Sequence, residues 1–337
     1  AGRRAVLVTR GARRTGPADE VLATDHGPLH GLAPVLGLEF GPAFGGVIDL
    51  PARPGHDDLN TVLDVVTAPP GPVLEDLVAV RAGRILAARL RDADPTPSGL
   101  RVRADATYLV TGALGAVGRE LVVDLVRRGA RRLLLVGRRV EADLDTAAQE
   151  LLTRLRDDGI GVGYVGGGCD TADSRRQVAL ALRGMPPLGG VLHAAGTITR
   201  IPAVDLDTAR TAAALRAKVG GAWWLHRLTR DLRLDFFVLV SSVSALWGTE
   251  GYAAYAAANG GLDALAAYRR SLGLPAVSIA YGPWAVSGMA DGDSRDRFAR
   301  LGVGALDPAT GCAALRDETP GPEGYLVACP LDRPRLD

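Results

Sequence analysis

A regular alternation of strand-like and helical segments begins near Ala106 and continues to about Ala280. The predicted strands are residues 107–111, 132–136, 162–165, 190–193, 236–241 and 276–280, and the predicted helices are residues 117–128, 145–157, 174–183, 208–229 and 255–272. Because the strands are continuous apolar runs, we expect them to be buried on both faces. The pattern predicts an α/β fold, a doubly wound parallel sheet with helices on both sides.

The first hundred residues follow a different pattern. Strand-like segments are predicted at residues 5–9, 46–50, 77–82 and 84–90, the last two joined by a tight turn at Ala82-Gly83. Residues 27–45 and 68–72 are rich in Gly and Pro, which indicates connecting chain. A Pro-containing run at 94–99 predicts a linker, so we expect one domain at 1–103 and another at 104–337.

Composition argues against several functions. The chain has 39 Lys and Arg residues against 38 Asp and Glu, a net charge of +1, so no strong field attracts nucleic acid or a membrane surface. No apolar run approaches the ~18 residues of a membrane span, and no signal peptide is visible. Cys169, Cys312 and Cys329 have no metal-binding spacing, which predicts reduced thiols in a cytoplasmic protein without a metal site. The scattered His26 and His30 are expected to be solvated or internally hydrogen-bonded rather than ligands, as is His56.

A glycine-rich turn lies between the first strand and the first helix of the alternating region. Its glycines, Gly112, Gly115 and Gly118, are three residues apart within 111–118. Such a turn lets backbone amides at a helix N-terminus approach a pyrophosphate. A tight turn without a ligand is the alternative, but the strand–turn–helix setting favours a nucleotide site.

Arg138 and Arg139 follow the second strand, where an NAD-specific fold places an acidic residue. Guanidinium groups pair well with a 2′-phosphate, so we predict NADPH rather than NADH; solvated arginines are the alternative. Asp170, after the third strand, is expected to bind an adenine amino group. Small residues after the fourth strand would let the backbone pass close to the cofactor: Ala194, Ala195 and Gly196.

Four residues together predict ketone reduction. Lys218 is the only lysine in the chain, Ser242 ends a strand, and Tyr255 and Asn259 share a helix face. A nearby cation lowers the pKa of tyrosine from about 10, which makes Tyr255 a better proton donor. We expect Lys218 to supply that cation, Ser242 to hold the carbonyl oxygen, and Asn259 to position Lys218 or a relay water. Each residue alone has an ordinary packing or turn role as its alternative.

The segment from Thr107 to about Met289 resembles the ketoreductase domains of modular polyketide synthases, within the short-chain dehydrogenase/reductase superfamily. The matching motifs are residues 111–118, 137–139, 193–196, 218–223, 241–242 and 255–259. Most short-chain reductases carry their lysine four residues after the tyrosine. Here Asn259 holds that position and the lysine comes from an earlier helix, an exchange typical of polyketide ketoreductases. Residues 45–51 and 75–90 resemble, more loosely, the family's structural subdomain, a truncated Rossmann-like fold whose opening strand and helix are not found here.

The resemblance implies a substrate and partners. The substrate would be a β-ketoacyl thioester on the phosphopantetheine arm of an acyl carrier protein, reduced with NADPH beside neighbouring synthase domains. The resemblance also implies further cofactor contacts: Thr111, Leu114, Val117, Pro283 and Trp284, with Lys218 and Tyr255. Residues 291–300 would form a lid helix or an ordinary surface helix.

Two features of the family bear on stereochemistry. Members that make the D-hydroxyl carry Leu-Asp-Asp where this chain has residues 198–200, Ile-Thr-Arg. Members that make the L-hydroxyl, the A-type, carry a tryptophan eight residues before the tyrosine, and Trp247 holds that position. Both features favour A-type, with Trp247 limiting the direction of substrate approach or, alternatively, only packing. Tyr252 is neither Gln nor His, so the subtype stays open with a preference for A1; Met289 is a third expected substrate contact.

Two other functions remain open on the sequence. One is a domain of the same fold that no longer reduces and serves as a structural spacer or an epimerase. Intact cofactor and catalytic motifs argue against it. The other is a free-standing short-chain reductase of small ketones, which the missing Tyr-x-x-x-Lys motif and the N-terminal part argue against.

Overall fold

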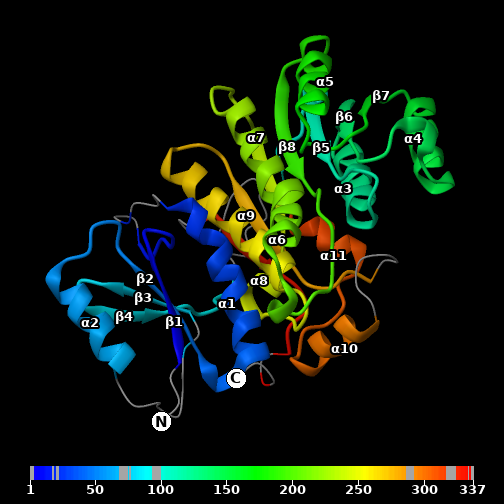
Figure 1. The fold of residues 1–337 in the computed structure, drawn as a ribbon. Coiled ribbons are helices and arrows are strands. Elements are labelled where there is room, and N and C mark those ends of the chain that lie inside the picture. The colour runs from blue at the N-terminus through cyan, green and yellow to red at the C-terminus, as the bar shows by residue number, and fades with distance from the viewer. Residues whose placement is uncertain are drawn as a thin grey trace.

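The computed structural model describes residues 4–16, 19, 23–67, 75, 77–92, 100–285, 292–315, 324–332 and 334. These residues form two separate β-sheets, one from each part of the chain (Figure 1). The predicted linker at 94–99 lies outside the described residues.

The N-terminal sheet has four strands in sequence order, β1 (Ala5–Arg10), β2 (Phe44–Leu50), β3 (Leu77–Arg81) and β4 (Arg84–Ala87). The first three are parallel, and β3 and β4 form an antiparallel hairpin. All four predicted strands and the hairpin are therefore confirmed. His30 is buried with its Nε2 atom 2.9 Å from the Thr9 hydroxyl, so it is internally hydrogen-bonded.

The interpretation of residues 27–45 as connecting chain is wrong. Residues Gly27–Phe40 form helix α1, and a second helix that was not predicted, α2, spans His56–Thr67. Proline is tolerated in a first helical turn, as at Pro28, but Pro34 lies within the helix. Helices in proteins gain most of their stability from tertiary packing, and α1 packs along the long helix α9 (Ala253–Ser271), which outweighs its weak propensity.

The contact between α1 and α9 brings the two helix backbones together (Figure 1). A Cβ atom at Gly31 would lie 2.9 Å from the Gly260 nitrogen and closer still to the Ala256 carbonyl oxygen. A Cβ atom at Gly260 would lie 2.6 Å from the Gly27 carbonyl oxygen. Only glycine fits at these positions, so the N-terminal part is held directly against the helix that carries Tyr255.

The main sheet has seven parallel strands in the order β11-β10-β9-β8-β5-β6-β7. The strands are β5 (Thr107–Thr111), β6 (Arg132–Val136), β7 (Gly161–Val165), β8 (Leu188–His193), β9 (Phe236–Ser242), β10 (Val277–Tyr281) and β11 (Tyr325–Ala328). The six predicted strands are confirmed, and β11 is an addition. The chain winds outward in both directions from β5, which leaves a crevice at the carboxyl ends of the strands.

Helices cover both faces of this sheet, as predicted. One buried cluster includes side chains of α3 (Ala116–Arg127), α4 (Thr146–Asp157) and α11 (Pro308–Ala313). The opposite cluster includes side chains of α5 (Ala172–Arg183), α7 (Gly221–Thr229) and α9. The remaining helices are α6 (Thr208–Leu215), α8 (Ser244–Trp247), α10 (Gly292–Arg300) and the 3₁₀ turns Thr24–His26, Gly41–Ala43, Glu141–Asp143 and Ala203–Asp205.

One predicted helix is interrupted. Residues 208–229 form α6 and α7, separated by a π-helical turn, Arg216–Gly220, that contains Lys218. Single π-turns occur often at functional sites, because they widen a helix locally and redirect a side chain.

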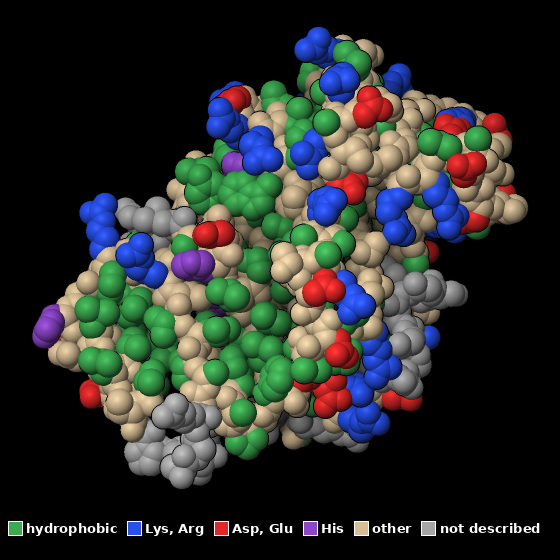
Figure 2. Space-filling model, viewed as in Figure 1, with side chains coloured by type: hydrophobic (Ala, Val, Ile, Leu, Met, Phe, Trp, Pro, Cys, Tyr) green, Lys and Arg blue, Asp and Glu red, His purple; other side chains and the backbone are tan. Residues whose placement is uncertain are grey.

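Surface character differs between the two parts. Hydrophobic side chains gather over the N-terminal sheet and α1, whereas charged side chains dominate the helices at the other end of the molecule (Figure 2). Within the described ranges, no helix combines the length and apolar character that crossing a membrane requires.

Candidate active site

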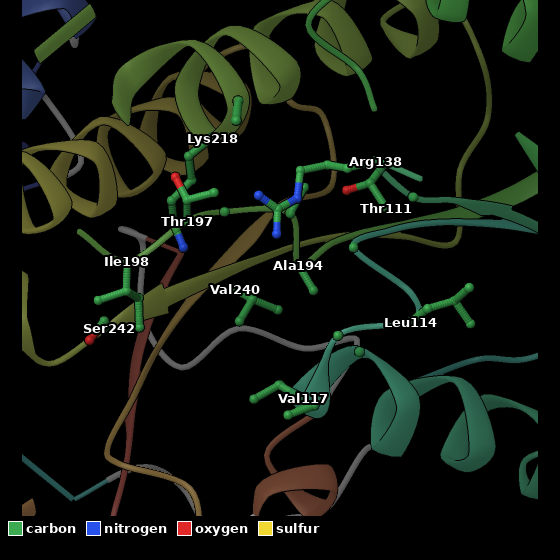
Figure 3. Close-up of a pocket in the computed structure, with 18 of the residues that line it drawn as sticks. Thr111, Leu114, Val117, Arg138, Ala194, Thr197, Ile198, Lys218, Val240 and Ser242 are labelled. Carbon is green, nitrogen blue, oxygen red and sulfur yellow. The ribbon is translucent and has the colours of Figure 1, made fainter. Parts of the chain in front are cut away.

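A cleft of about 750 Å³ lies at the carboxyl ends of the strands of the main sheet. Residues at or just beyond the ends of β5, β6, β7, β8, β9 and β10 line it. Ser242 and Ile198 lie toward one end of the cleft and Leu114 toward the other (Figure 3). This is the crevice where open α/β sheets bind their ligands.

Most of the residues predicted from the sequence come together in this cleft. Those that line it are Thr111, Gly112, Leu114, Gly115, Val117, Gly118, Arg138, Arg139, Asp170, Ala194, Ala195, Gly196, Lys218, Ser242, Tyr252, Tyr255, Pro283 and Trp284. Asn259 and Trp247 do not line it, and Met289 lies outside the described residues.

The glycine-rich turn forms the floor of one half of the cleft. Gly112 has a φ of +67°, and a Cβ atom there would lie 2.6 Å from the Ala194 carbonyl carbon and the Ala195 nitrogen. Gly115 is the N-cap of α3 and provides no side-chain hydrogen bond to its first amides. The N-terminus of α3 therefore keeps the free N–H groups and positive dipole end that suit a pyrophosphate.

The two arginines after β6 differ in their surroundings. The Arg138 side chain extends into the cleft toward Ala194 (Figure 3). Arg139 forms an ion pair with Asp145, Nη1 to Oδ2 3.5 Å, and Asp145 also pairs with Arg119 at 2.8 Å. Arg138 is thus the better placed of the two to meet a 2′-phosphate.

Lys218 and Tyr255 are stacked at the other half of the cleft. The Lys218 Nζ atom lies over the Tyr255 ring, 5.2 Å from its centroid. Burial lowers the pKa of Lys218 to about 8, with Asp263 opposing that shift. Burial raises the pKa of Tyr255, while hydrogen bonds with the side chains of Ser242 and Asn259 oppose the rise. The tyrosine is thus protonated at neutral pH. The expected lowering of its pKa by Lys218 is not found, because burial outweighs the interactions that oppose it.

Ser242 stands at the end of β9 beside these two residues. Its hydroxyl oxygen accepts hydrogen bonds from the backbone nitrogen of Ser244, at 3.2 Å, and from the Ser244 hydroxyl, at 3.1 Å. Both contacts come from the start of α8, so the turn after the strand fixes the serine. A substrate oxygen held by Ser242 would also face Tyr255.

His193 is a buried residue beside Lys218 that the sequence did not single out. Burial lowers the pKa of His193 to about 4, so the ring is neutral. Its Nε2 atom lies 2.8 Å from the Lys218 carbonyl oxygen and therefore donates, while Nδ1, 2.7 Å from the Thr111 hydroxyl, accepts. His193 thereby fixes the π-helical turn that carries Lys218. Its position at the end of a strand within a matching motif was the only available signal.

Asn259 is completely buried one helical turn after Tyr255. Its Nδ2 atom donates a hydrogen bond to the Tyr255 carbonyl oxygen at 2.9 Å. Its Oδ1 atom has no hydrogen-bond partner among the described residues, which is unusual for a buried acceptor. The free oxygen could accept a hydrogen bond from a water or an ammonium group, which is what the predicted positioning of Lys218 or a relay water needs.

Asp263 follows Asn259 by another helical turn and was also missed. Its carboxylate accepts a hydrogen bond from the Ser278 hydroxyl at 2.6 Å. Burial raises the pKa of Asp263 to about 6, against the opposing effects of Ser278 and Lys218. The carboxylate therefore contributes negative charge beneath Lys218 at neutral pH.

Of the expected substrate contacts Tyr252 and Trp247, only Tyr252 lines the cleft. Tyr252 lines the cleft, whereas Trp247 is partly buried and packs on a small cluster that includes Val243 and Phe298. Phe298 belongs to α10 and does line the cleft, and its neighbour Arg297 pairs with Glu250. Trp247 therefore packs on a hydrophobic cluster beside the cleft and does not line the cleft itself.

The donor sets fit a dinucleotide and do not form a metal site. In the part of the chain that the structure describes, no group of three His, Cys, Asp or Glu side chains could hold a metal ion. The buried Nε1 atom of Trp284 also has no partner in that part. A glycine cradle, an open helix N-terminus and a free guanidinium are the features that a phosphorylated nicotinamide dinucleotide requires.

Comparison with known proteins gives a consistent result. Residues 106–286 match the family model described as KR domain. Polyketide synthase GfsA of Streptomyces halstedii is 40% identical over 331 residues, which cover 95% of this chain but only 4% of the synthase. A solved structure of A-type ketoreductases from a modular polyketide synthase has a TM-score of 0.85 at 36% identity, covering 98% of this chain and 69% of the other.

The backbone does not discriminate between subtypes. A solved C2-type ketoreductase from a modular polyketide synthase also has a TM-score of 0.85, at 33% identity, covering 98% of this chain and 71% of the other. Any subtype must therefore be argued from side chains.

Proposed function

The chain belongs to the KR domain family of modular polyketide synthases, and we propose that it reduces a β-ketoacyl thioester on an acyl carrier protein, using NADPH. The product would be the β-hydroxyacyl thioester. The observation that carries this proposal is the Lys218 ammonium over the ring of Tyr255, beside Ser242 in the cleft. The glycine cradle occupies the other half of the same cleft.

The protein residues divide the proton chemistry among them. NADPH, when bound, supplies the hydride that the β-carbon receives. Ser242 would hold the β-keto oxygen, and Tyr255 would transfer its phenolic proton to that oxygen as the carbonyl becomes an alkoxide. Lys218 would stabilise the tyrosinate that remains, because an opposite charge nearby favours the charged form. A water hydrogen-bonded to the free Asn259 oxygen would relay a new proton from solvent to the tyrosinate of Tyr255.

The cofactor would be held along the line of strand ends. The pyrophosphate would lie on the N-terminus of α3 and the 2′-phosphate at Arg138, with Asp170 at the adenine. The nicotinamide end would lie toward Tyr255, next to Pro283 and Trp284. A preference for NADPH over NADH follows from the charge of the arginines and the absence of an acidic residue after β6.

We propose A-type stereochemistry, with a preference for A1. Ile198 and Thr199 line the cleft where the D-hydroxyl members carry Leu and the first Asp of their Leu-Asp-Asp motif. Trp247 would act through the hydrophobic cluster that it packs on, of which Phe298 lines the cleft. Because Tyr252 also lines the cleft, its bulk would limit the space for an α-substituent.

The two sheets support a further proposal on domain organisation. Residues 1–103 would serve as a structural subdomain, and residues 104–337 would perform catalysis. Through the close packing of α1 on α9, the structural part would fix the position of the helix that carries Tyr255 and Asn259.

NADPH oxidation with a racemic 2-methyl-3-ketoacyl thioester, followed by chiral analysis of the alcohol, tests these proposals. We expect NADPH consumption and an L-hydroxy product with one dominant methyl configuration. A D-hydroxy product would keep the reductase and overturn the A-type assignment. Tight NADPH binding and exchange of the substrate's α-proton, without oxidation of NADPH, would show that the protein is an epimerase and not a reductase. Equal rates with free small ketones would instead favour a free-standing reductase.

A further inference from the structure

Glu39 joins the N-terminal part to two distant segments of the catalytic part. It lies in the last turn of α1, and its side chain is half-buried. The Oε2 atom accepts a hydrogen bond from the Ala203 backbone nitrogen at 2.6 Å, and Oε1 accepts one from the Gly251 backbone nitrogen at 2.7 Å. Both hydrogen bonds are short, as is typical of backbone N–H groups that donate to a carboxyl group.

Both segments reach the cleft within a few residues of these contacts. Thr197, Ile198 and Thr199 line the cleft upstream of Ala203, and Thr249 and Tyr252 line it on either side of Gly251. The two segments also touch each other directly. The Ile201 nitrogen donates to the Gly251 carbonyl oxygen at 2.6 Å, and Ile201 forms a parallel bridge with Tyr252. Glu39, segment 197–203 and segment 249–252 are therefore joined to one another by hydrogen bonds. They lie behind one wall of the cleft, at the end away from the glycine cradle.

The helix that carries Glu39 is itself held in place. Gly248 has a φ of +72°, and a Cβ atom there would lie 2.8 Å from the carbonyl oxygen of Pro34 on α1. Further toward its start, α1 contacts the backbone of α9 at Gly31. Glu39 thus connects the two wall segments to α1, which also packs against α9, the helix that carries Tyr255.

We propose that Glu39 is a positioning residue that sets the acyl side of the cleft for the substrate. This inference rests on the proposed function. The carboxylate fixes the separation of segments 197–203 and 249–252, and so controls how the acyl chain is oriented before Tyr255 delivers its proton. Replacing it with an apolar side chain would leave two backbone N–H groups without their acceptor, and these groups would move to reach water.

Two variants and a matched control test this role. Glu39→Ala removes both acceptors, and Glu39→Gln keeps one carbonyl oxygen in nearly the same shape. Glu75→Ala is the control, because Glu75 is a carboxylate of the N-terminal part that pairs with Arg89 on the surface. NADPH affinity, kcat, KM, product stereochemistry and melting temperature are measured for each protein.

We expect Glu39→Ala to lower kcat/KM for a β-ketoacyl thioester by about 10- to 100-fold, mainly through KM, and to erode the stereochemical ratio. NADPH affinity should stay within about twofold, because the glycine cradle is remote from Glu39. Glu39→Gln should recover part of the loss, and Glu75→Ala should behave as the native protein. Unchanged kcat/KM and product ratio in Glu39→Ala would overturn the proposal, as would a parallel loss of NADPH binding and melting temperature.

Hydrogen–deuterium exchange separates this inference from the proposed function. In Glu39→Ala, amides of segments 197–204 and 246–254 should exchange faster, while those of β5 and α3 should not change. Native protein that reduces no β-ketoacyl thioester would refute the proposed function, whereas unaltered exchange in these two segments would refute the role of Glu39. Glu39→Gln carries the same test if the alanine variant does not fold.

Discussion

Replacing Lys218 with methionine should make the protein more stable and, at the same time, inactive. The Lys218 side chain is 4% exposed, and burial lowers its pKa from 10.5 to about 8. Each unit of pKa corresponds to 1.36 kcal/mol, so keeping this ammonium charged at pH 7 costs the folded state about 3 kcal/mol. Methionine has a similar length and no charge. We expect Lys218→Met to raise the free energy of unfolding by about 1–3 kcal/mol at pH 7, less where lost contacts offset the gain.

The pH dependence of this gain has a definite sign. Between pH 8 and pH 10.5, the unfolded chain binds a proton at Lys218 that the folded chain has released. The stability of the native protein therefore rises with pH in this window relative to the variant. The difference in free energy of unfolding between Lys218→Met and the native protein is largest below about pH 8. It falls to roughly half by pH 9.5 and vanishes above 10.5.

Urea unfolding followed by tryptophan fluorescence, without cofactor, at pH 7 and pH 9.5 measures this difference. Arg216→Met is the control, because Arg216 is an exposed cation in the same π-helical turn and its loss should leave stability nearly unchanged. Turnover of Lys218→Met should fall on the order of 10²- to 10⁴-fold. A variant that is less stable at pH 7, or a difference that does not change with pH, would show that bonds to the ammonium outweigh the cost of burying it.

Three further variants test the proton donor, the cofactor site and the contact between the two parts. Tyr255→Phe should reduce kcat steeply, because the hydroxyl is the proton donor, with NADPH affinity by fluorescence titration nearly unchanged; normal turnover would remove Tyr255 from the mechanism. Replacing Arg138 and Arg139 together with alanine should weaken NADPH binding far more than NADH binding, mostly through Arg138, and equal weakening would place recognition of the 2′-phosphate elsewhere. Gly31→Ala should lower the free energy of unfolding by about 2–3 kcal/mol in urea, because its Cβ would overlap the Ala256 carbonyl. An unchanged value would mean that α1 shifts without cost.

The sequence was a reliable guide where local patterns decide structure. Apolar runs and helical periods placed six of the seven strands of the main sheet and most of its helices, because the period of buried residues differs between strands and helices. It failed for α1, whose Gly and Pro content argues against a helix. The glycines of that segment are there for close packing against α9, and no local pattern reports a partner more than two hundred residues away.

The sequence by itself determined the fold class, the glycine-rich turn and the set of residues that we propose for ketone reduction, since each depends on residue type and short spacing. Only the tertiary structure decided how those residues act. It gave Arg138 and Arg139 different surroundings, packed Trp247 on a hydrophobic cluster beside the cleft, and brought His193 to the Lys218 carbonyl oxygen. It also brought the Glu39 carboxylate to two amides at the substrate side. The physical reason is that hydrogen bonds and burial depend on distance in space, which the folded chain sets between residues far apart in sequence.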